Sequence, residues 1–403
     1  MYRKKPDHIL KGVCISLGFS FAFVLLEIFA RVLPASDIFS RKLPQRCKSP
    51  IESFSEVTQD CLSQITARSQ GIYTKGKFPP FPIKTFKKAN DIGQFTDVDF
   101  REVVGSKVNI LPILSIGDSF VEALQVQNAE TFHGLLNNYI SKNNKIIKSS
   151  AIGTSGNPLS QYLISAMYAN NHITNPESIY IFSIIANDFD ESILGKSAFQ
   201  YGGRFKLTDD GRNEIIYINR YSSFAVKIRR LIKNYSALSR YLASNLNVSS
   251  LAYKYPFCMI ADFPCEQIKN FSANIIDSSE SEDSSRFEVS YEASDIFLSQ
   301  VEKLRNTPLK RGNTIFIVDA DRNSIYDENS LESEYFKKQR DYFIKKAKNY
   351  GFTVIDMKSV FAEHYQSNKE RFEFVNDGHW NSLGHKIIAE EIAKELNLKL
   401  KSQ

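Results

Sequence analysis

The sequence predicts an α/β protein with three layers, in which a parallel β-sheet lies between two layers of helices. From Asn109 onward, short apolar runs with the length of buried strands alternate with longer stretches whose apolar residues recur at helical spacing. This alternation is typical of parallel sheets, because parallel strands need crossover connections and helices usually supply them. A chain of 403 residues with 42% hydrophobic content can bury the core that such a domain requires.

The N-terminal segment predicts a transmembrane helix. Residues 12–30 form a 19-residue apolar run whose one charged residue is Glu27, and this run is long enough to cross a bilayer. A cleaved signal peptide and a buried core helix are the alternatives. The run exceeds the usual hydrophobic region of a signal peptide, and no good small-x-small cleavage site follows it. The expected order is a cytoplasmic tail (1–9), an uncleaved signal-anchor (10–33), and a proline-containing stalk and loop-rich entry segment that precede the main domain (34–108).

Cysteine spacing and domain length predict on which side of the membrane the main domain lies. Basic residues flank the anchor on both sides in nearly equal number, so the positive-inside rule does not decide. A long C-terminal domain translocates regardless of local charge, and Cys47/Cys61 and Cys258/Cys265 are two sequence-local pairs suited to disulfides in an oxidising compartment. Four reduced thiols in a cytosolic domain are the alternative. We expect a single-pass protein of the cell membrane whose main domain is periplasmic or extracellular.

The apolar pattern predicts the elements of the main domain, residues 109–398, in order. Buried strands are expected at 109–116, 145–152 and 178–184. Helical spacing from Phe132 to Ile140 and from Leu159 to Met167 predicts the helices between them. After an interruption, strands are expected at 313–320 and 352–357, and helices near 332–349 and 382–396.

The interruption is an insertion at about residues 193–312. Within it, an apolar stripe from Phe224 to Leu238 is flanked by basic residues, namely Lys227, Arg229, Arg230 and Lys233. We interpret the stripe as a helix with a solvated basic face that packs on an ordinary core, and a helix on a membrane surface is the alternative. The run 277–286, rich in serine and acidic residues, is expected to be a mobile, solvated loop.

Reactive side chains gather where the predicted strands end. In an open parallel sheet, ligands bind beyond the carboxyl ends of the strands. A serine at such a strand-to-helix turn exposes its hydroxyl, and the N–H groups at the start of the helix favour a developing oxyanion. His379 can act as the base for that serine, because Asp377 can orient its imidazole. The strand ends hold Gly117-Asp118-Ser119, Gly153-Thr154-Ser155-Gly156 and Ala186-Asn187-Asp188, and Asn376-Asp377-Gly378-His379 precedes the last helix, in which His385 is expected to be a surface or packing residue.

These blocks resemble the SGNH/GDSL-type hydrolases, a family named for four blocks around a serine, a glycine, an asparagine and a histidine. "GDSF" (117–120) matches the first block, and "DGHWNSLGHKIIAEEIAKEL" (377–396) matches the last. "GTSGNPLSQ" (153–161) and "IANDFDE" (185–191) resemble the second and third. The resemblance covers about residues 90–398 in the family's order, and it implies an SGNH-hydrolase-like fold.

The resemblance also implies a role for each site residue. Ser119 would be the nucleophile, His379 the base, and Asp377 the acid that orients the base. The oxyanion hole would be made by the N–H groups of Ser119 and Gly153 and by the side-chain amide of Asn187.

Three positions depart from the family's pattern. Ala151 stands where many members have asparagine, Ile185 replaces a glycine, and Asn376 occupies the acid position of the common Asp-x-x-His spacing. The spacing of Asp377 and His379, followed by a tryptophan, is similar to that of alginate O-acetylating relatives.

The predicted function is that of a membrane-anchored serine esterase. It would act on an acyl ester, with an acylated envelope glycan as the candidate substrate, through an acyl-serine intermediate. An O-acyltransferase acting on an envelope polysaccharide is one alternative, and a catalytically silent glycan-binding domain is another. No Cys/His spacing suggests zinc and no glycine-rich loop suggests a phosphate site, so neither metal nor cofactor is expected. The 51 basic and 45 acidic residues are intermixed, which argues against a nucleic-acid partner.

Overall fold

The computed structural model describes most of the chain, and its contacts divide the chain into two units. The smaller unit comprises Met1–Ile38, Gly71–Phe86 and Ser222–Gln267, and the larger unit comprises Phe39–Gln70, Lys87–Tyr221 and Ile268–Gln403. Cys258, Cys265 and Asn376 lie outside the described residues, as does most of the stripe from Phe224 to Leu238. The described residues are 7–33, 40–42, 47–62, 64–67, 70–76, 81–105, 109–194, 202–207, 213–218, 232, 235–245, 284–304, 313–327, 333–375 and 377–401.

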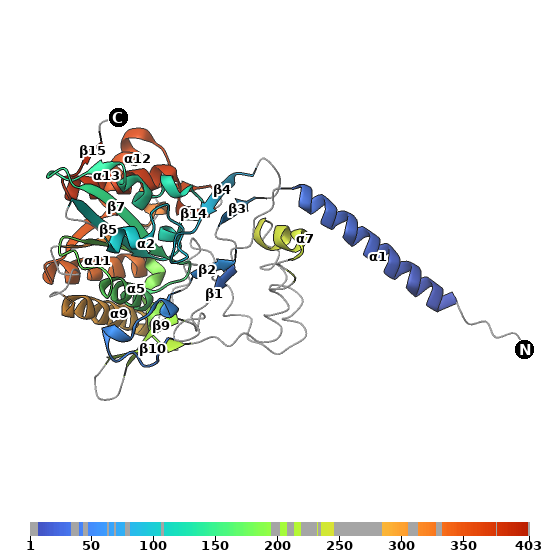
Figure 1. Cartoon of the computed structure of the whole chain (residues 1–403), viewed down its shortest axis with the longest axis horizontal. Coiled ribbons are helices and arrows are strands. Elements are labelled where there is room, and N and C mark those ends of the chain that lie inside the picture. Colours follow the sequence, from blue (N-terminus) through green and yellow to red (C-terminus); the bar gives the residue numbers. More distant parts are fainter. Residues whose placement is uncertain are drawn as a thin grey trace, which may run out of the picture. The chain divides into compact units, whose positions relative to one another are not determined.

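The larger unit is built on a sheet with the strand order β12-β11-β8-β5-β7-β6-β15. Figure 1 labels β5, β7 and β15 of this sheet. The five strands from β12 to β7 are parallel, and β6 is antiparallel to both β7 and β15. Along the chain the parallel strands follow the doubly wound order 2-1-3-4-5, whose switch point lies between β5 and β8. The predicted α/β fold class is therefore confirmed. The strands are β5 (Ile110–Gly117), β6 (Tyr139–Ile140), β7 (Ile146–Gly153), β8 (Ile179–Ile184), β11 (Thr314–Val318), β12 (Thr353–Asp356) and β15 (Lys399–Leu400).

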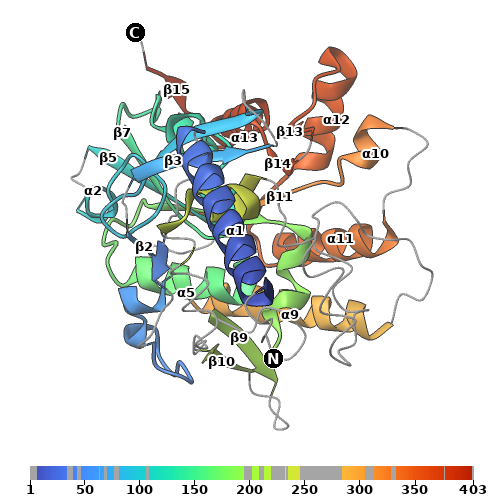
Figure 2. The ribbon, with the colours of Figure 1, turned by 90° about the vertical axis from the view of Figure 1, so that its right-hand side faces the viewer.

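Helices cover both faces of this sheet. Figure 2 shows α5, α9 and α11 together on one side of the larger unit and α12 and α13 on the other. Side chains of each strand alternate between two apolar cores: in β5, Ile113 belongs to one core and Leu114 and Ile116 to the other. The first layer contains α2 (Phe100–Val104), α5 (Leu159–Asn170), α9 (Ser284–Lys303) and α11 (Glu334–Asn349), and the second contains α4 (Phe132–Leu136), α12 (Met357–Asn368) and α13 (Ser382–Glu395).

The helix expected from Phe132 to Ile140 is shorter than the apolar spacing predicts. It ends at Leu136, because the side chain of Asn137 pairs with the backbone of β7: it accepts a hydrogen bond from Ser149 N at 2.8 Å and donates one to Ser149 O at 3.0 Å. Tyr139 and Ile140 then form the edge strand β6. The hydrogen bonds of the Asn137 side chain to β7 therefore end the helix, although the apolar spacing predicts that it continues to Ile140.

The region called an insertion contributes to the main core. Helix α9 lies within its span, and its residues Ala293, Phe297 and Val301 are completely buried in the same core as α5 and α11. The strands β9 (Gly202–Leu207) and β10 (Asn213–Ile218) form an antiparallel hairpin in the same span. Part of the predicted insertion, helix α9, therefore belongs to one of the two helical layers.

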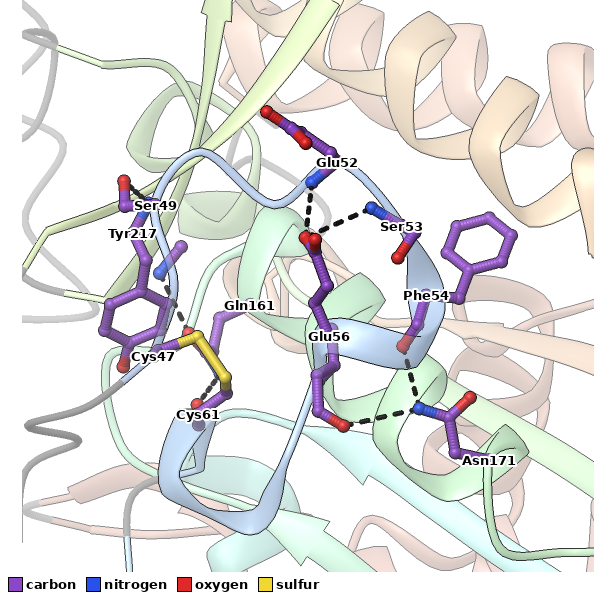
Figure 3. The surroundings of a disulfide bond; sticks show 12 residues. Cys47, Ser49, Glu52, Ser53, Phe54, Glu56, Cys61, Gln161, Asn171 and Tyr217 are labelled. Atoms are coloured by element: carbon purple, nitrogen blue, oxygen red, sulfur yellow. Dashed lines mark hydrogen bonds between the residues drawn. A yellow bond between two sulfur atoms is a disulfide. The ribbon is translucent and has the colours of Figure 1, made fainter.

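Residues 47–62, which the sequence assigned to the stalk, pack on the larger unit (Figure 3). The predicted Cys47–Cys61 disulfide is present, with the two Cα atoms 4.8 Å apart. Helix α5 holds this segment at both ends of the helix: Gln161 donates a hydrogen bond to Cys61 O at 3.1 Å, and Asn171 donates one to Phe54 O at 2.7 Å. This part of the predicted stalk and entry segment therefore packs against α5.

The smaller unit contains the predicted anchor. Helix α1 (Asp7–Val32) includes a stretch, Lys11–Val32, that is long and apolar enough to cross a membrane. The strands β3 (Gln70–Lys75) and β4 (Ile83–Lys88) pair with each other, and β4 leads into the larger unit. The unit also contains α7 (Ala237–Arg240), which continues into a π-helical turn, Tyr241–Asn245.

Replacing both Cys47 and Cys61 by alanine should lower the free energy of unfolding by about 3 kcal/mol, because the bond closes a loop with a sequence separation of 14. Urea titration of the full chain in detergent measures this value. Cys14→Ala, which removes an exposed free thiol, is the matched control and should leave it unchanged. Equal stability of the double variant and the wild type would contradict the prediction.

Candidate active site

Ser119 lies at the turn between β5 and the short helix α3 (Ser119–Glu122). Asp118 caps this helix, and its Oδ1 accepts a hydrogen bond from Phe120 N at 2.9 Å. Ser119 is partly exposed, whereas Gly117, Asp118 and Phe120 are buried. The turn therefore presents the serine hydroxyl at the carboxyl end of the central strand, beside the switch point of the sheet.

Two glycines allow α3 to lie directly against the strand ends. A Cβ atom on Gly153, the last residue of β7, would lie 2.6 Å from Glu122 N, and one on Gly117 would lie 2.3 Å from Val121 Cγ2. Neither backbone nor a buried valine can move away cheaply in a close-packed interior. Glycine at both positions is thus a steric requirement of the turn that carries Ser119.

Asp377 and His379 lie on β14 (Asp377–Trp380), which pairs with β13 (Glu373–Phe374). Alternate residues of a strand point to the same face, so a spacing of two brings both side chains together. His379 Nδ1 is hydrogen-bonded to Asp377 Oδ1, and Asp377 is buried. The regular geometry of a short strand thus makes this contact.

The serine and histidine segments are in contact. The centre of the Phe120 ring lies 4.8 Å from that of the His379 ring. The residue that follows Ser119 thus contacts His379. The Ser119 hydroxyl itself donates to Asp118 Oδ2 at 3.2 Å in this structure. Hydrogen bonds between catalytic groups often tighten only when substrate binds.

Gln125 and Arg322 contact the β14 segment that carries Asp377 and His379, and neither residue was predicted from the sequence. Gln125 Nε2 donates to Asp377 Oδ2 at 3.2 Å, so the two carboxylate oxygens of Asp377 are held by different side chains. Arg322 donates to Gly378 O at 3.0 Å, and its guanidinium lies 5.4 Å from the ring centre of Phe120. No motif marks either residue, because each acts through a contact made between segments distant in sequence.

One of the three expected oxyanion donors is engaged by an acceptor of the protein: the Gly153 N–H donates to Gln94 Oε1 at 3.1 Å. Ser119 is partly exposed, and Asn187, in the turn after β8, is exposed. The oxyanion hole therefore stays a prediction, and for Gly153 it requires that Gln94 move aside.

Several carboxyl groups near Ser119 have raised pKa values. Burial raises the pKa of Asp118 to about 6, against the opposing effect of the hydrogen bond from Phe120 N. Burial, aided by the neighbouring charge of Asp190, raises the pKa of Glu191 to about 7. Burial and the charge of Asp118 also raise the pKa of Asp188 well above its usual range. Strongly perturbed carboxyl groups gathered at strand ends are typical of functional sites.

Two basic side chains of the larger unit, Lys87 and His385, are buried. Lys87 is completely buried, and its Nζ donates to Ala123 O and Val126 O, each at 2.9 Å. It thereby stabilises the turn that follows α3, residues 123–126. His385 is buried in α13 and accepts a hydrogen bond from Phe132 N at 3.3 Å, so of the two predicted alternatives, a surface residue or a packing residue, it is the second. Within the described ranges, no three His, Cys, Asp or Glu side chains form a group that could hold a metal ion.

The chain is similar to solved structures of lipolytic enzymes, whereas no protein-family model and no curated protein sequence matches it. A member of the lipolytic G-D-S-L family from Veillonella parvula is 10% identical, with 71% of this chain and 97% of that chain covered and a TM-score of 0.35. For the lipase/acylhydrolase from Enterococcus faecalis the values are 10%, 72%, 98% and 0.34. For an acetylxylan esterase from Geobacillus stearothermophilus they are 11%, 72%, 96% and 0.34.

The buried amine of Lys87 should make stability depend on pH. Burial lowers its pKa to about 7 in the folded chain, whereas an exposed lysine has a pKa of about 10.4. Between these two values the unfolded chain binds more protons at this position, so the folded state gains stability as the pH rises. Relative to Lys87→Met, the wild type should therefore gain on the order of 1 kcal/mol per pH unit in this window.

Urea titrations at pH 7, 8 and 9 measure this difference. Lys88→Met, which changes an exposed lysine of the same strand, is the control and should follow the wild type. A constant difference between wild type and Lys87→Met across this range would show that the amine is not titrating in the folded chain.

Proposed function

We propose that this chain is a serine ester hydrolase whose catalytic residues are Ser119, His379 and Asp377. One observation carries the proposal: a buried carboxylate binds the imidazole of His379 on β14, beside the short helix that begins at Ser119. This is the order of groups that a serine nucleophile needs, since the base must be held in one tautomer while its other nitrogen faces the hydroxyl.

The chemistry proceeds in two halves. The Ser119 hydroxyl turns from Asp118 to His379, and Oγ attacks the acyl carbonyl as His379 Nε2 takes the proton. Asp377 stabilises the imidazolium, and the imidazolium then protonates the alcohol that leaves. In the second half, His379 removes a proton from water, which attacks the acyl-serine and releases the acid. Ser119 regains its proton from the same imidazolium.

Gln125 fits this scheme as a positioning residue. Its amide binds the oxygen of Asp377 that faces away from the imidazole, so it keeps the carboxylate from rotating. Ser119 begins α3 and Gln125 follows its end, so nucleophile and acid are supported by the same short segment of the chain.

The natural ester and the cellular location are further parts of the proposal. The apolar helix α1 supports a single-pass, membrane-anchored protein, and the Cys47–Cys61 disulfide supports an oxidising compartment, periplasmic or extracellular. An acylated envelope glycan is accessible to a site in that position. An O-acyltransferase would use the same residues, with a sugar hydroxyl in place of water.

Activity on short p-nitrophenyl esters tests the proposal, and an added oligosaccharide acceptor separates the two enzymes. A hydrolase releases the free acid with or without the acceptor, whereas a transferase yields acylated oligosaccharide. A catalytically silent glycan-binding domain would neither hydrolyse the ester nor be labelled by a serine-reactive fluorophosphonate.

Ser119→Ala and His379→Ala should each remove nearly all activity, by roughly four or more orders of magnitude in kcat, because residues of such a unit act together. The p-nitrophenyl ester assay measures the rate, and circular dichroism checks that each variant is folded. If Ser119→Ala retained a tenth of the wild-type rate, another nucleophile would have to be sought.

Asp377→Asn should lower kcat by about four orders of magnitude, because a neutral amide cannot stabilise the imidazolium. Asn376→Ala, at the neighbouring position, is the matched control and should keep most of the activity. The same assay with both variants measures this. Wild-type activity in Asp377→Asn would mean that a different carboxylate serves His379 or that serine and histidine work as a dyad.

A further inference from the structure

We propose that Ile232 and residues 235–242 lie in the interfacial layer of the membrane that α1 spans, so that the smaller unit contacts lipid with two segments and not with α1 alone. This inference goes beyond the esterase and rests only on the membrane anchor of the proposed function. Its starting point is Glu27, the one charged side chain in the apolar run 12–30.

A carboxylate on a membrane-spanning helix is costly unless other groups of the protein satisfy it. Glu27 has such partners in α7 and the residues before it. Its Oε2 accepts hydrogen bonds from Ser236 Oγ at 2.8 Å and from Leu238 N at 3.0 Å, and its Oε1 accepts one from Ala237 N at 2.8 Å. Its side chain is only 15% exposed, although most of α1 is exposed.

Arg31, one turn further along α1, adds a second connection to the same segment. Its Nε binds Glu27 Oε1 at 3.0 Å, and its terminal nitrogen donates to Tyr235 O at 3.1 Å. Four consecutive residues, 235–238, are thus bound to two successive turns of α1.

These contacts set the depth of the segment. Glu27 precedes Val32, the last residue of α1, by five residues, or about 8 Å along the helix axis. The apolar stretch Lys11–Val32 has 22 residues, or about 33 Å, which is close to the thickness of the hydrocarbon core. Residues that touch the Glu27 carboxylate therefore lie near the boundary between hydrocarbon and headgroups.

The side chains of the segment suit that layer. Ile232, Tyr235 and Leu242 are 50%, 73% and 36% exposed, and large apolar side chains with this exposure lose contact with water when they enter a bilayer surface. A tyrosine is favoured at the interface, since its ring is apolar and its hydroxyl is polar.

Tyr241 of this segment and Asn245, just beyond it, contact the region of β3 and β4 in the smaller unit. Asn245 Nδ2 donates to Thr74 Oγ1 of β3 at 3.0 Å, and the ring of Tyr241 lies 6.5 Å from that of Phe81. Residues 235–245 therefore connect the anchor helix to β3 and to the approach to β4. Helix α1 and these residues therefore form one connected unit. The side chains of Ile232, Tyr235 and Leu242 are the surface of this unit that is proposed to face the membrane.

Quenching of tryptophan emission by lipids brominated in the upper part of their chains tests the proposal in full-length protein reconstituted into vesicles. The natural chain has one tryptophan, Trp380, which is 1% exposed in the larger unit and serves as the unquenched background. Tyr235→Trp reports the segment. Phe19→Trp, on the exposed face of α1, is the control for insertion, and Val375→Trp, at an exposed site of the larger unit, is the control for water.

The proposal requires that the emission added by Tyr235→Trp be quenched as that added by Phe19→Trp is, whereas the emission added by Val375→Trp is not. Quenching of Phe19→Trp without quenching of Tyr235→Trp would overturn it, since α1 would then be the one lipid contact tested. Quenching of neither would overturn it together with the anchor. Esterase assays on the same vesicles are read separately, so loss of the enzyme proposal leaves this result intact.

Discussion

The close approach of α3 to the ends of β5 and β7 is the constraint on which the rest of the site depends. Gly117 and Gly153 leave no room for a side chain between helix and strands, so the helix must begin where β5 ends. That position puts Ser119 at the switch point of a doubly wound sheet. It also puts Phe120 against the rings of His379 and Trp380, which is how the histidine segment is brought to the serine.

The groups around this turn are polar and buried, and each is held by another. Lys87 binds two carbonyls of the turn, Gln125 extends from the turn to Asp377, and Asp377 binds His379. Buried polar groups are costly when unpaired, so such a chain of contacts favours one arrangement over others. The same property makes the turn a rigid support, which suits groups that must meet at fixed distances.

The smaller unit follows the same physical rule. A carboxylate in an apolar helix needs donors, and residues 236–238 supply them to Glu27. In the larger unit, paired polar groups fix a turn of a protein core. In the smaller unit, they fix which residues lie beside the apolar helix α1. In both, the polar group is informative because leaving it unpaired is costly.

The sequence by itself determined the class of fold, five strands of the sheet and the serine and histidine segments, because strand and helix periods and short motifs are local properties. It also determined that Cys47 could pair with Cys61, since the two are close along the chain. Tertiary structure alone decided the rest. The helix after Phe132 ends early because Asn137 finds a strand partner in Ser149, and α9 joins the core although it lies in an apparent insertion. Gln125, Lys87 and Arg322 support the site from positions no motif marks. Each of these outcomes depends on contacts between residues distant in sequence, and such contacts exist only once the sheet has formed.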